Sequence, residues 1–308
     1  MSSAIGLRCY QITVHRRGDT TALSFDDDEL EFAPASFVGN FVNRHVTAVP
    51  SGERERSWYF EERESAGTGN SIGYVHYGTF GFESNLVSYK TKKRNYRRKV
   101  DDVEEIPLFY EFWCPSRTDY GLASFQSFQG RSCIGLVMER MELDFEQANP
   151  GYRLRFRKLL PSDSAGSLYS RAPVKELRLV RRHAPSDVTD RYFPGGAPTD
   201  IDFEVAFIAR RRKSLGMLGD LTRQLRRDNR TGLVTHDGIE FGEAVAKVRV
   251  GRRYRPVGVF GLNSDAGVID VTEDIERGLD GHPTFESLQE QSDEILADFH
   301  ETLSGRSR

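Results

Sequence analysis

The sequence predicts a protein of hairpin-connected strands and amphipathic helices, divided into two domains. Segments in which apolar and polar residues alternate recur along the chain, and this alternation is typical of half-buried strands. Other segments repeat apolar residues at helical spacing. At 308 residues the chain is long enough for a large core and exceeds the usual size of one domain.

The N-terminal region is expected to begin with a strand from Ile5 to Val14. A helix follows, because apolar residues recur on one face of a helical projection. His45 lies on that apolar stripe and is expected at the edge of the core, not as a ligand. The members of the stripe are Phe37, Val38, Phe41, Val42, His45, Val46 and Val49.

Two hairpins and a helix are expected next. Trp58 to Glu62 and Ser71 to Tyr89 are predicted to be antiparallel strands. Leu108 to Cys114 and Gly121 to Phe128 form the second predicted hairpin, and a helix from Arg131 to Phe145 packs on it. These elements belong to a globular domain expected over residues 1–170.

A second, basic domain is expected over residues 171–275. It opens with a strand from Val174 to Arg182, and a stretch from Pro194 to Pro198 that contains two glycines is a predicted linker or hinge. The last helix, Thr284 to Leu303, follows Pro283 at its start and has an apolar stripe. Residues 276–308 can pack back on the globular domain.

Charge is sorted along the second half of the chain. Phe203 to Arg255 holds thirteen Lys and Arg against six Asp and Glu, a local +7, whereas Pro256 to Arg308 holds three against twelve, a local −9. The whole chain has a formal charge of only −3. Sorting on this scale indicates a surface for a polyanion.

Within the basic segment, a cationic helix is predicted after Ser214, a plausible N-cap. Its apolar stripe is Leu215, Leu218, Leu221 and Leu225, and its basic stripe is Arg223, Arg226, Arg227 and Arg230. Such a stripe is either the ordinary solvated face of an amphipathic helix or a phosphate-binding surface.

A strand with two outward cations follows. Ala244 to Val250 alternate strictly, so Lys247 and Arg249 share one face. Gly251 then opens a basic turn, from Arg252 to Arg255, into a strand from Val257 to Leu262. Arginine outnumbers lysine in the chain, and its planar fork matches phosphate. The candidate DNA-binding residues are Lys247, Arg249, Arg210, Arg211, Arg212, Lys213, Arg223, Arg226, Arg227, Arg252 and Arg253.

A second basic cluster lies between Lys90 and Lys99, with Tyr89 and Tyr96 interleaved, and it abuts an acidic stretch from Asp101 to Glu105. The cluster could bind phosphate, and its mix of aromatic and cationic residues suits single-stranded nucleic acid. It could equally fold onto its acidic neighbours. The second interpretation is favoured, because adjacent opposite charges screen each other.

From about Leu108 onward, the order of these elements resembles the RexA family, the sensors of the Rex phage-exclusion system. The resemblance is one of pattern and element order, with little identity. The segments that carry it are LFYEFWC, YGLASFQSF, RSCIGLVMERM, YRLRFRKL, VKELRLV, IDFEVAFIARRRKS, AVAKVRV and TFESLQEQSDEILADF.

This resemblance implies an α+β protein with mixed or antiparallel sheets and packed helices, in which a globular domain carries a mobile, swivel-like second domain, as in the related architecture of RdgC. It also implies a cytoplasmic homodimer that binds duplex DNA without sequence preference and activates a membrane-embedded partner, RexB. By position, Lys247 and Arg249 match the family's basic pair for DNA contact, and Arg210 to Lys213 match its basic exit from the preceding strand. Arg223, Arg226 and Arg227 depend on the helix argument alone.

Two other functional classes remain as alternatives, a DNA-processing nuclease and a dimeric interaction regulator that does not bind DNA. None of the eight lysines has a carboxylate two residues before it, as the PD-(D/E)xK nucleases require, and no P-loop, GxSxG, HExxH or zinc-binding spacing is present. The sequence therefore predicts no enzymatic activity, no cofactor and no metal. Cys9, Cys114 and Cys133 have no disulfide or zinc-site pattern and are expected to be buried.

Overall fold

The computed structural model describes residues 4–25, 30, 33–51, 55–64, 69–128, 132–159, 170–182, 193, 201–227, 234–237, 239–261 and 267–305. The chain forms two compact units. Unit 1 comprises Met1–Gln11 and Arg157–Arg308, and unit 2 comprises Ile12–Phe156. The first strand, β1 (Ile5–Arg16), contributes residues to both. The expected domain limits near residues 170 and 275 both lie inside unit 1.

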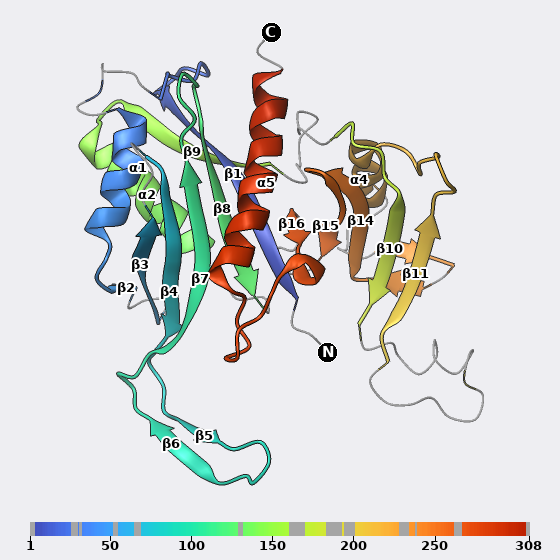
Figure 1. Cartoon of the computed structure of the whole chain (residues 1–308), viewed down its shortest axis with the longest axis horizontal. Coiled ribbons are helices and arrows are strands. Elements are labelled where there is room, and N and C mark those ends of the chain that lie inside the picture. The colour runs from blue at the N-terminus through green and yellow to red at the C-terminus, as the bar shows by residue number, and fades with distance from the viewer. Residues whose placement is uncertain are drawn as a thin grey trace. The chain divides into compact units, whose positions relative to one another are not determined.

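Unit 2 is built on strands in the order β1-β8-β7-β4-β3-β2, and the pairs from β8 to β2 are antiparallel (Figure 1). β9 also pairs with β1. The strands are β2 (Val49–Ser51), β3 (Arg56–Glu64), β4 (Ser71–Thr79), β7 (Glu104–Trp113), β8 (Gly121–Phe128) and β9 (Tyr152–Lys158). Both predicted hairpins are therefore present, but the strand segment expected from Ser71 to Tyr89 ends at Thr79, and a separate strand follows from Ser84 to Val87.

Two helices, α1 (Pro34–Arg44) and α2 (Ile134–Ala148), cover this sheet with aromatic contacts. The Phe37 ring lies edge-on to Phe145, with centroids 5.0 Å apart, and so joins the two helices. Phe41 stacks on Trp58 of β3 at 6.3 Å. All four side chains are buried, and aromatic pairs of this geometry add about 1 kcal/mol each beyond their buried area.

The apolar stripe of α1 is confirmed only in part. Phe37, Phe41 and Val42 are buried, and so is His45, whose Nδ1 lies 2.8 Å from the carbonyl oxygen of Phe41. The expected continuation of the helix is wrong. It ends at Arg44, Val46 is 50% exposed, and the chain turns into β2.

In unit 1 the strands follow the order β11-β10-β14-β15-β16-β1, and each neighbouring pair from β11 to β1 is antiparallel. Its strands are β10 (Glu176–Arg181), β11 (Phe203–Ile208), β14 (Glu243–Val250), β15 (Arg253–Gly261) and β16 (Val268–Asp270), and a separate hairpin pairs β12 (Val234–His236) with β13 (Ile239–Phe241). Helices α4 (Leu218–Arg227) and α5 (Phe285–Ser304) and the 3₁₀ turn η2 (Thr272–Asp274) complete it. The α+β class is confirmed. The expected linker from Pro194 to Pro198 lies outside the described residues.

The last helix was predicted closely from its pattern. Phe285, Leu288, Ile295, Leu296 and Phe299 of α5 are all buried, as expected for its inward face. The three cysteines are buried as well. No helix in the described part of the chain combines the length and the apolarity that crossing a membrane requires.

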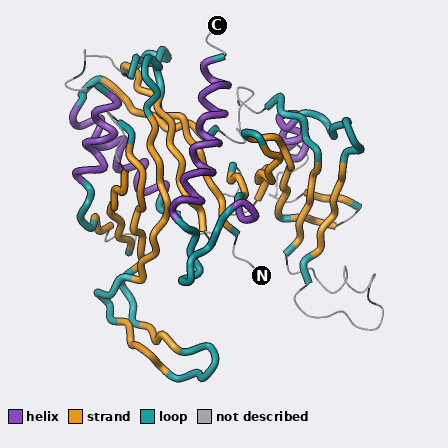
Figure 2. The backbone as a smooth tube through the Cα atoms, viewed as in Figure 1, coloured by secondary structure: helices purple, strands orange, loops and turns teal. Residues whose placement is uncertain are grey.

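A two-stranded hairpin, β5 (Ser84–Val87) with β6 (Arg94–Arg98), extends from the end of β4 and β7 (Figure 2). The second basic cluster of the sequence lies on it. We call this segment, from Phe82 to Asp102, the arm. The acidic residues of the arm bond to residues near the sheet. The Asp102 carboxylate accepts hydrogen bonds from the Tyr96 hydroxyl at 2.5 Å and from the Lys99 backbone N–H at 2.7 Å.

A polar cluster ties three strands of unit 2 together. His76 on β4 lies with Nε2 2.6 Å from Glu61 on β3 and with Nδ1 3.0 Å from Glu105 on β7. The Tyr59 ring stacks on the imidazole at 4.7 Å, and its hydroxyl donates to Glu105. The hydrogen bond from His76 is the main cause that lowers the pKa of the Glu61 carboxyl.

This lowered pKa makes the stability of the protein depend on pH. A carboxyl group whose pKa is lower in the folded state stabilises the fold above its unfolded pKa, and that contribution is lost as the pH falls through the folded pKa. We therefore expect Glu61→Gln to lower the free energy of unfolding near neutral pH by less than about 1 kcal/mol, because the side chain is partly exposed. The difference from wild type should vanish below about pH 3, when urea unfolding is followed across a pH series. The control is Glu62→Gln, on the opposite face of the strand. A difference that persists unchanged in acid would contradict the assignment.

Candidate nucleic-acid interface

The alternation predicted for β14 is confirmed. Ala244, Ala246, Val248 and Val250 are buried, whereas Lys247 is half-buried and Arg249 is exposed. The inner face therefore belongs to the core of unit 1, and the two cations project from the other face. In the described part of the chain, no carboxylate pairs with either side chain.

Backbone hydrogen bonds bring the Arg210–Lys213 turn close to this pair. Lys175, immediately before β10, donates its N–H to the carbonyl of Lys247 at 2.9 Å, and its own carbonyl accepts the N–H of Ala209 at 2.9 Å. Two strand spacings, about 10 Å, therefore separate β14 from the start of the turn. The Lys175 side chain also donates to the carbonyl oxygen of Lys213. We call the resulting cluster the basic edge; its members are Lys175, Arg210, Arg211, Arg212, Lys213, Lys247 and Arg249.

The basic edge is accessible and carries a net positive charge. All four residues of the turn are exposed. Within the described residues, Arg249 makes one long hydrogen bond, 3.3 Å, from Nε to the carbonyl of Gly251. Among the described residues, none of the seven cations pairs with a carboxylate. Neighbouring unpaired cations raise the local potential and attract phosphate.

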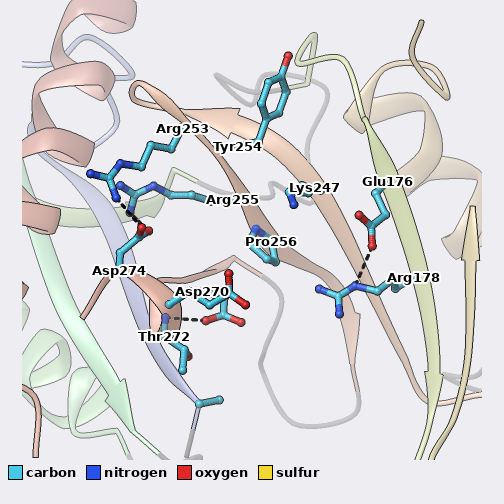
Figure 3. A pocket seen from close by; sticks show the side chains of 12 residues that line it. Glu176, Arg178, Lys247, Arg253, Tyr254, Arg255, Pro256, Asp270, Thr272 and Asp274 are labelled. Carbon is cyan, nitrogen blue, oxygen red and sulfur yellow. Dashed lines mark hydrogen bonds and ion pairs between the residues drawn. The ribbon is translucent and has the colours of Figure 1, made fainter. Parts of the chain in front are cut away.

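The cleft beside Lys247 is a different environment. It has a volume of about 500 Å³, and Figure 3 shows Lys247 at its middle, between the Arg178–Glu176 pair and Arg253 with Asp274. Four cations and four carboxylates line it: Arg178, Lys247, Arg253 and Arg255, with Glu176, Asp270, Glu273 and Asp274. A wall with balanced charge does not favour a polyanion, so the exposed members of the basic edge, which do not line this cleft, are better candidates than Lys247.

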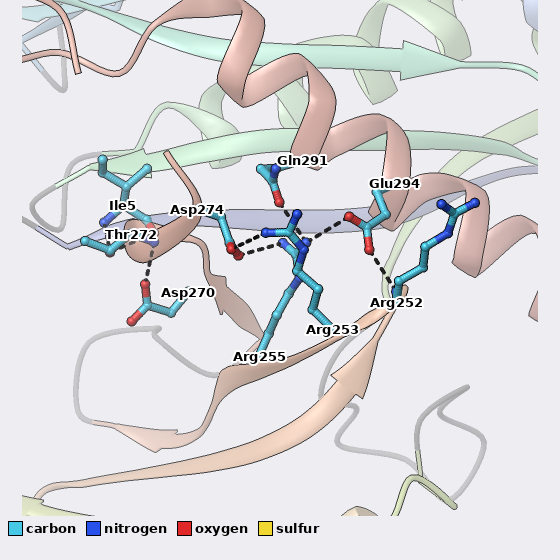
Figure 4. A network of polar contacts seen from close by, with 9 residues as sticks. All are labelled: Ile5, Arg252, Arg253, Arg255, Asp270, Thr272, Asp274, Gln291 and Glu294. Carbon is cyan, nitrogen blue, oxygen red and sulfur yellow. Dashed lines mark hydrogen bonds and ion pairs between the residues drawn. The ribbon is translucent and has the colours of Figure 1, made fainter. Parts of the chain in front are cut away.

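The residues of the expected basic turn, Arg252 to Arg255, differ in burial. Arg252 and Tyr254 are exposed, but Arg255 is 1% exposed and faces α5. Its Nη2 donates to Gln291 at 2.7 Å and lies 3.3 Å from Glu294, and its Nη1 lies 3.7 Å from Asp274 (Figure 4). Burial is the main cause that lowers the pKa of this guanidinium.

Arg253 also pairs within unit 1. Its Nη1 lies 2.6 Å from Asp274, and both side chains remain partly exposed. The same acidic segment reaches the turn backbone, because Glu294 accepts the N–H of Arg252 at 2.8 Å. Gly251 precedes it with a positive φ of 65°, a conformation that favours glycine. Asp274 already neutralises part of the charge of Arg253, whereas Arg252 has no paired carboxylate among the described residues.

The expected start of the cationic helix is wrong. The helix begins at Leu218, because Leu215 donates its N–H to the carbonyl of Val174 and Gly216 has a φ of 119°. Arg223 is exposed but pairs with Asp220 and donates Nε to Gly219 at 3.2 Å. Arg226 and Arg227 lie in the last turn of α4; their side chains, like all of Arg230, lie outside the described part. The helix therefore adds little support to the interface.

Two residues that the sequence interpretation missed belong to this region, Lys175 and Arg178. Both lie at the start of the strand that separates β11 from β14. The alternation of Glu176 and Arg178 with Leu177 and Leu179 was a usable signal for the outer face at the start of the strand, whereas Val180 is buried. Which strands flank β10 was not readable from the sequence.

Neither a metal-binding cluster nor a known relative adds to this geometry. Within the described ranges, no group of three or more His, Cys, Asp or Glu residues could hold a metal ion. No model of a known protein family matches the chain, and no curated protein matches it significantly. The resemblance to the RexA family and to RdgC therefore stays a prediction.

The buried Arg255 should be essential for the stability of unit 1. Arg255→Met removes the buried guanidinium from its hydrogen bond with Gln291 and from Asp274 and Glu294, and a hydrogen bond to a charged group contributes about 1.5–3 kcal/mol. We expect a loss of this size in the free energy of unfolding, measured by urea denaturation. Arg252→Met, at an exposed position nearby, should change it by less than about 0.5 kcal/mol. Equal effects of the two substitutions would contradict the buried network.

Proposed function

We propose that this protein binds duplex DNA without sequence preference and acts as the sensor of a phage-exclusion system of the RexA and RexB type. The observation that carries the DNA-binding part is the basic edge, where Lys247, Arg249 and the Arg210–Lys213 turn meet without paired carboxylates among the described residues. Contacts from Lys and Arg to phosphate fix position on DNA but read no bases. Binding through such a surface is sequence-neutral.

The remaining parts of the proposal depend on the family resemblance. They are a homodimer, a cytoplasmic location, a mobile second domain arranged as in RdgC, and a membrane-embedded RexB-like partner. A two-fold dimer would present the basic edge twice and double the number of phosphate contacts. With about six phosphates engaged, the log–log dependence of affinity on salt would have a slope of roughly −5.

The proposal includes no catalytic role. If the protein cleaves DNA in a reaction that depends on a divalent cation, the alternative function as a DNA-processing nuclease is supported instead. If the protein causes no mobility shift of DNA at about 50 mM salt, the alternative function as an interaction regulator is supported, because electrostatic binding is strongest at low salt.

Charge reversal on β14 tests the proposal. We expect Lys247→Glu with Arg249→Glu to abolish mobility shifts of random-sequence duplex, because two attractive contacts become repulsive. The milder Lys247→Gln with Arg249→Gln should make the salt slope shallower by about 2 per protomer, at about 0.9 per lost phosphate contact. Titrations over a salt series measure both effects.

The control is Arg153→Glu with Arg155→Glu, because these two residues are exposed and, like Lys247 and Arg249, lie two positions apart on a strand, β9; Arg153 lies 3.8 Å from Glu146. This control should bind duplex DNA as wild type does. If both double reversals weaken binding equally, the effect is one of overall charge, and the basic edge is not the interface.

A further inference from the structure

The arm is held at its base by one buried cation. Arg98 is 3% exposed, although it lies at the end of a short exposed strand. Its Nε donates to the carbonyl of Asp102 at 3.1 Å, its Nη2 donates to the carbonyl of Thr79, and the guanidinium lies over the Phe82 ring at 4.3 Å. These bonds fix the direction in which the arm leaves the sheet (Figure 1).

The tip of the arm is an ordered turn. The N–H of Ser88 donates to Lys93 at 2.8 Å, and the N–H of Lys92 donates back to Ser88 at 2.8 Å. β5 spans the four residues Ser84–Val87, so the turn begins about 13 Å from the start of the hairpin. An isolated hairpin of two strands is only marginally stable, so this hairpin contributes little to the stability of the fold. A binding role would explain why the chain has it.

Charge separates the tip from the base. All three acidic residues of the arm, Glu83, Asp101 and Asp102, lie at its base, where Glu83 pairs with Arg97 at 2.7 Å. The turn from Ser88 to Arg94 holds four cations and no acid. These are Lys90, Lys92, Lys93 and Arg94, all exposed, and within the described residues no carboxylate pairs with any of them.

An aromatic ring accompanies these cations. Tyr89 is 78% exposed at the turn, with the Lys90 ammonium 5.6 Å from its ring centroid. Leu86 and Val87 beside it are about half exposed. An exposed aromatic ring flanked by cations is the combination with which proteins bind single-stranded nucleic acid, since the ring stacks on a base and the cations contact phosphates.

We propose that the tip of the arm is a second nucleic-acid contact, which binds the sugar–phosphate chain through Lys90, Lys92, Lys93 and Arg94 and stacks Tyr89 on an unpaired base. This inference builds on the proposed function, because it assigns the protein a preference for DNA that carries a single-stranded segment, such as a tailed duplex. It differs in its residues, none of which belongs to the basic edge.

The experiment compares a blunt duplex with the same duplex carrying a single-stranded tail, by fluorescence anisotropy with the full chain. The charge variant combines Lys90→Gln, Lys92→Gln, Lys93→Gln and Arg94→Gln. Its matched control combines the same number of exposed neutralisations elsewhere, Arg44→Gln, Arg153→Gln, Arg155→Gln and Lys158→Gln. Tyr89→Ala and Tyr89→Phe test the ring, and circular dichroism verifies that every variant is folded.

Wild type should bind the tailed duplex more tightly than the blunt one. The charge variant should lose at least about tenfold in affinity for the tailed duplex and have a salt slope shallower by about 3, at about 0.7 per phosphate of a single strand. Tyr89→Ala should lose about tenfold on the tailed duplex alone, as one lost stacked base predicts, whereas Tyr89→Phe retains wild-type affinity. The matched control should keep the preference for the tail.

Three outcomes separate the two proposals. If wild type binds neither DNA, the proposed function fails and this inference fails with it. If wild type binds duplex but the charge variant and Tyr89→Ala bind both DNAs as wild type does, the arm inference is overturned and the proposed function stands. If the arm variants instead lose binding to vesicles of anionic phospholipid while DNA binding is unchanged, the arm is a membrane contact and the inference is likewise overturned.

Discussion

The buried guanidinium of Arg255 is the constraint on which the structure of unit 1 depends. A charge this deeply buried is unfavourable unless opposite charges and hydrogen bonds compensate it, and here α5 and η2 supply Glu294, Gln291 and Asp274. The acidic segment that follows the basic block in the sequence is therefore used, at least in part, within the same unit. This pairing attaches the last helix to β15 and decides which cations of the block remain at the surface.

Because Asp274 also holds Arg253, and Asp220 holds Arg223, the excess of positive charge counted along residues 203–255 overstates what a ligand can contact. The accessible part is concentrated on the outer face of β14 and on the turn after β11. Charge is distributed in a similar way on the arm of unit 2. Its acidic residues neutralise the cations next to the sheet and leave the tip of the arm positive. In both places a buried arginine, Arg255 or Arg98, organises the structure while exposed neighbours stay available for phosphate.

Elements with a strong local pattern were predictable from the sequence. The strict alternation of β14 placed Lys247 and Arg249 outward, and the apolar stripe of α5 identified its buried face. Patterns failed where a partner from elsewhere in the chain competes with local preference. Leu215 fits a helical stripe, but its N–H donates to the carbonyl of Val174, just before β10. Val46 continues the stripe of α1, but the chain has already turned towards β2. The acidic residues after Lys99 neighbour the basic cluster in sequence, yet hairpin geometry directs them to the base of the arm.

By itself, the sequence determined the α+β composition, the periodicity of the principal strands and helices, and the presence of two basic regions, because each of these is a property of neighbouring residues. Only the tertiary structure decided which cations are buried, which are paired and which share one surface. Those outcomes depend on strand order and on contacts such as Arg255 with Glu294, between residues far apart in the chain. Charge is counted along the chain, whereas the field that a ligand meets depends on distance and burial in space.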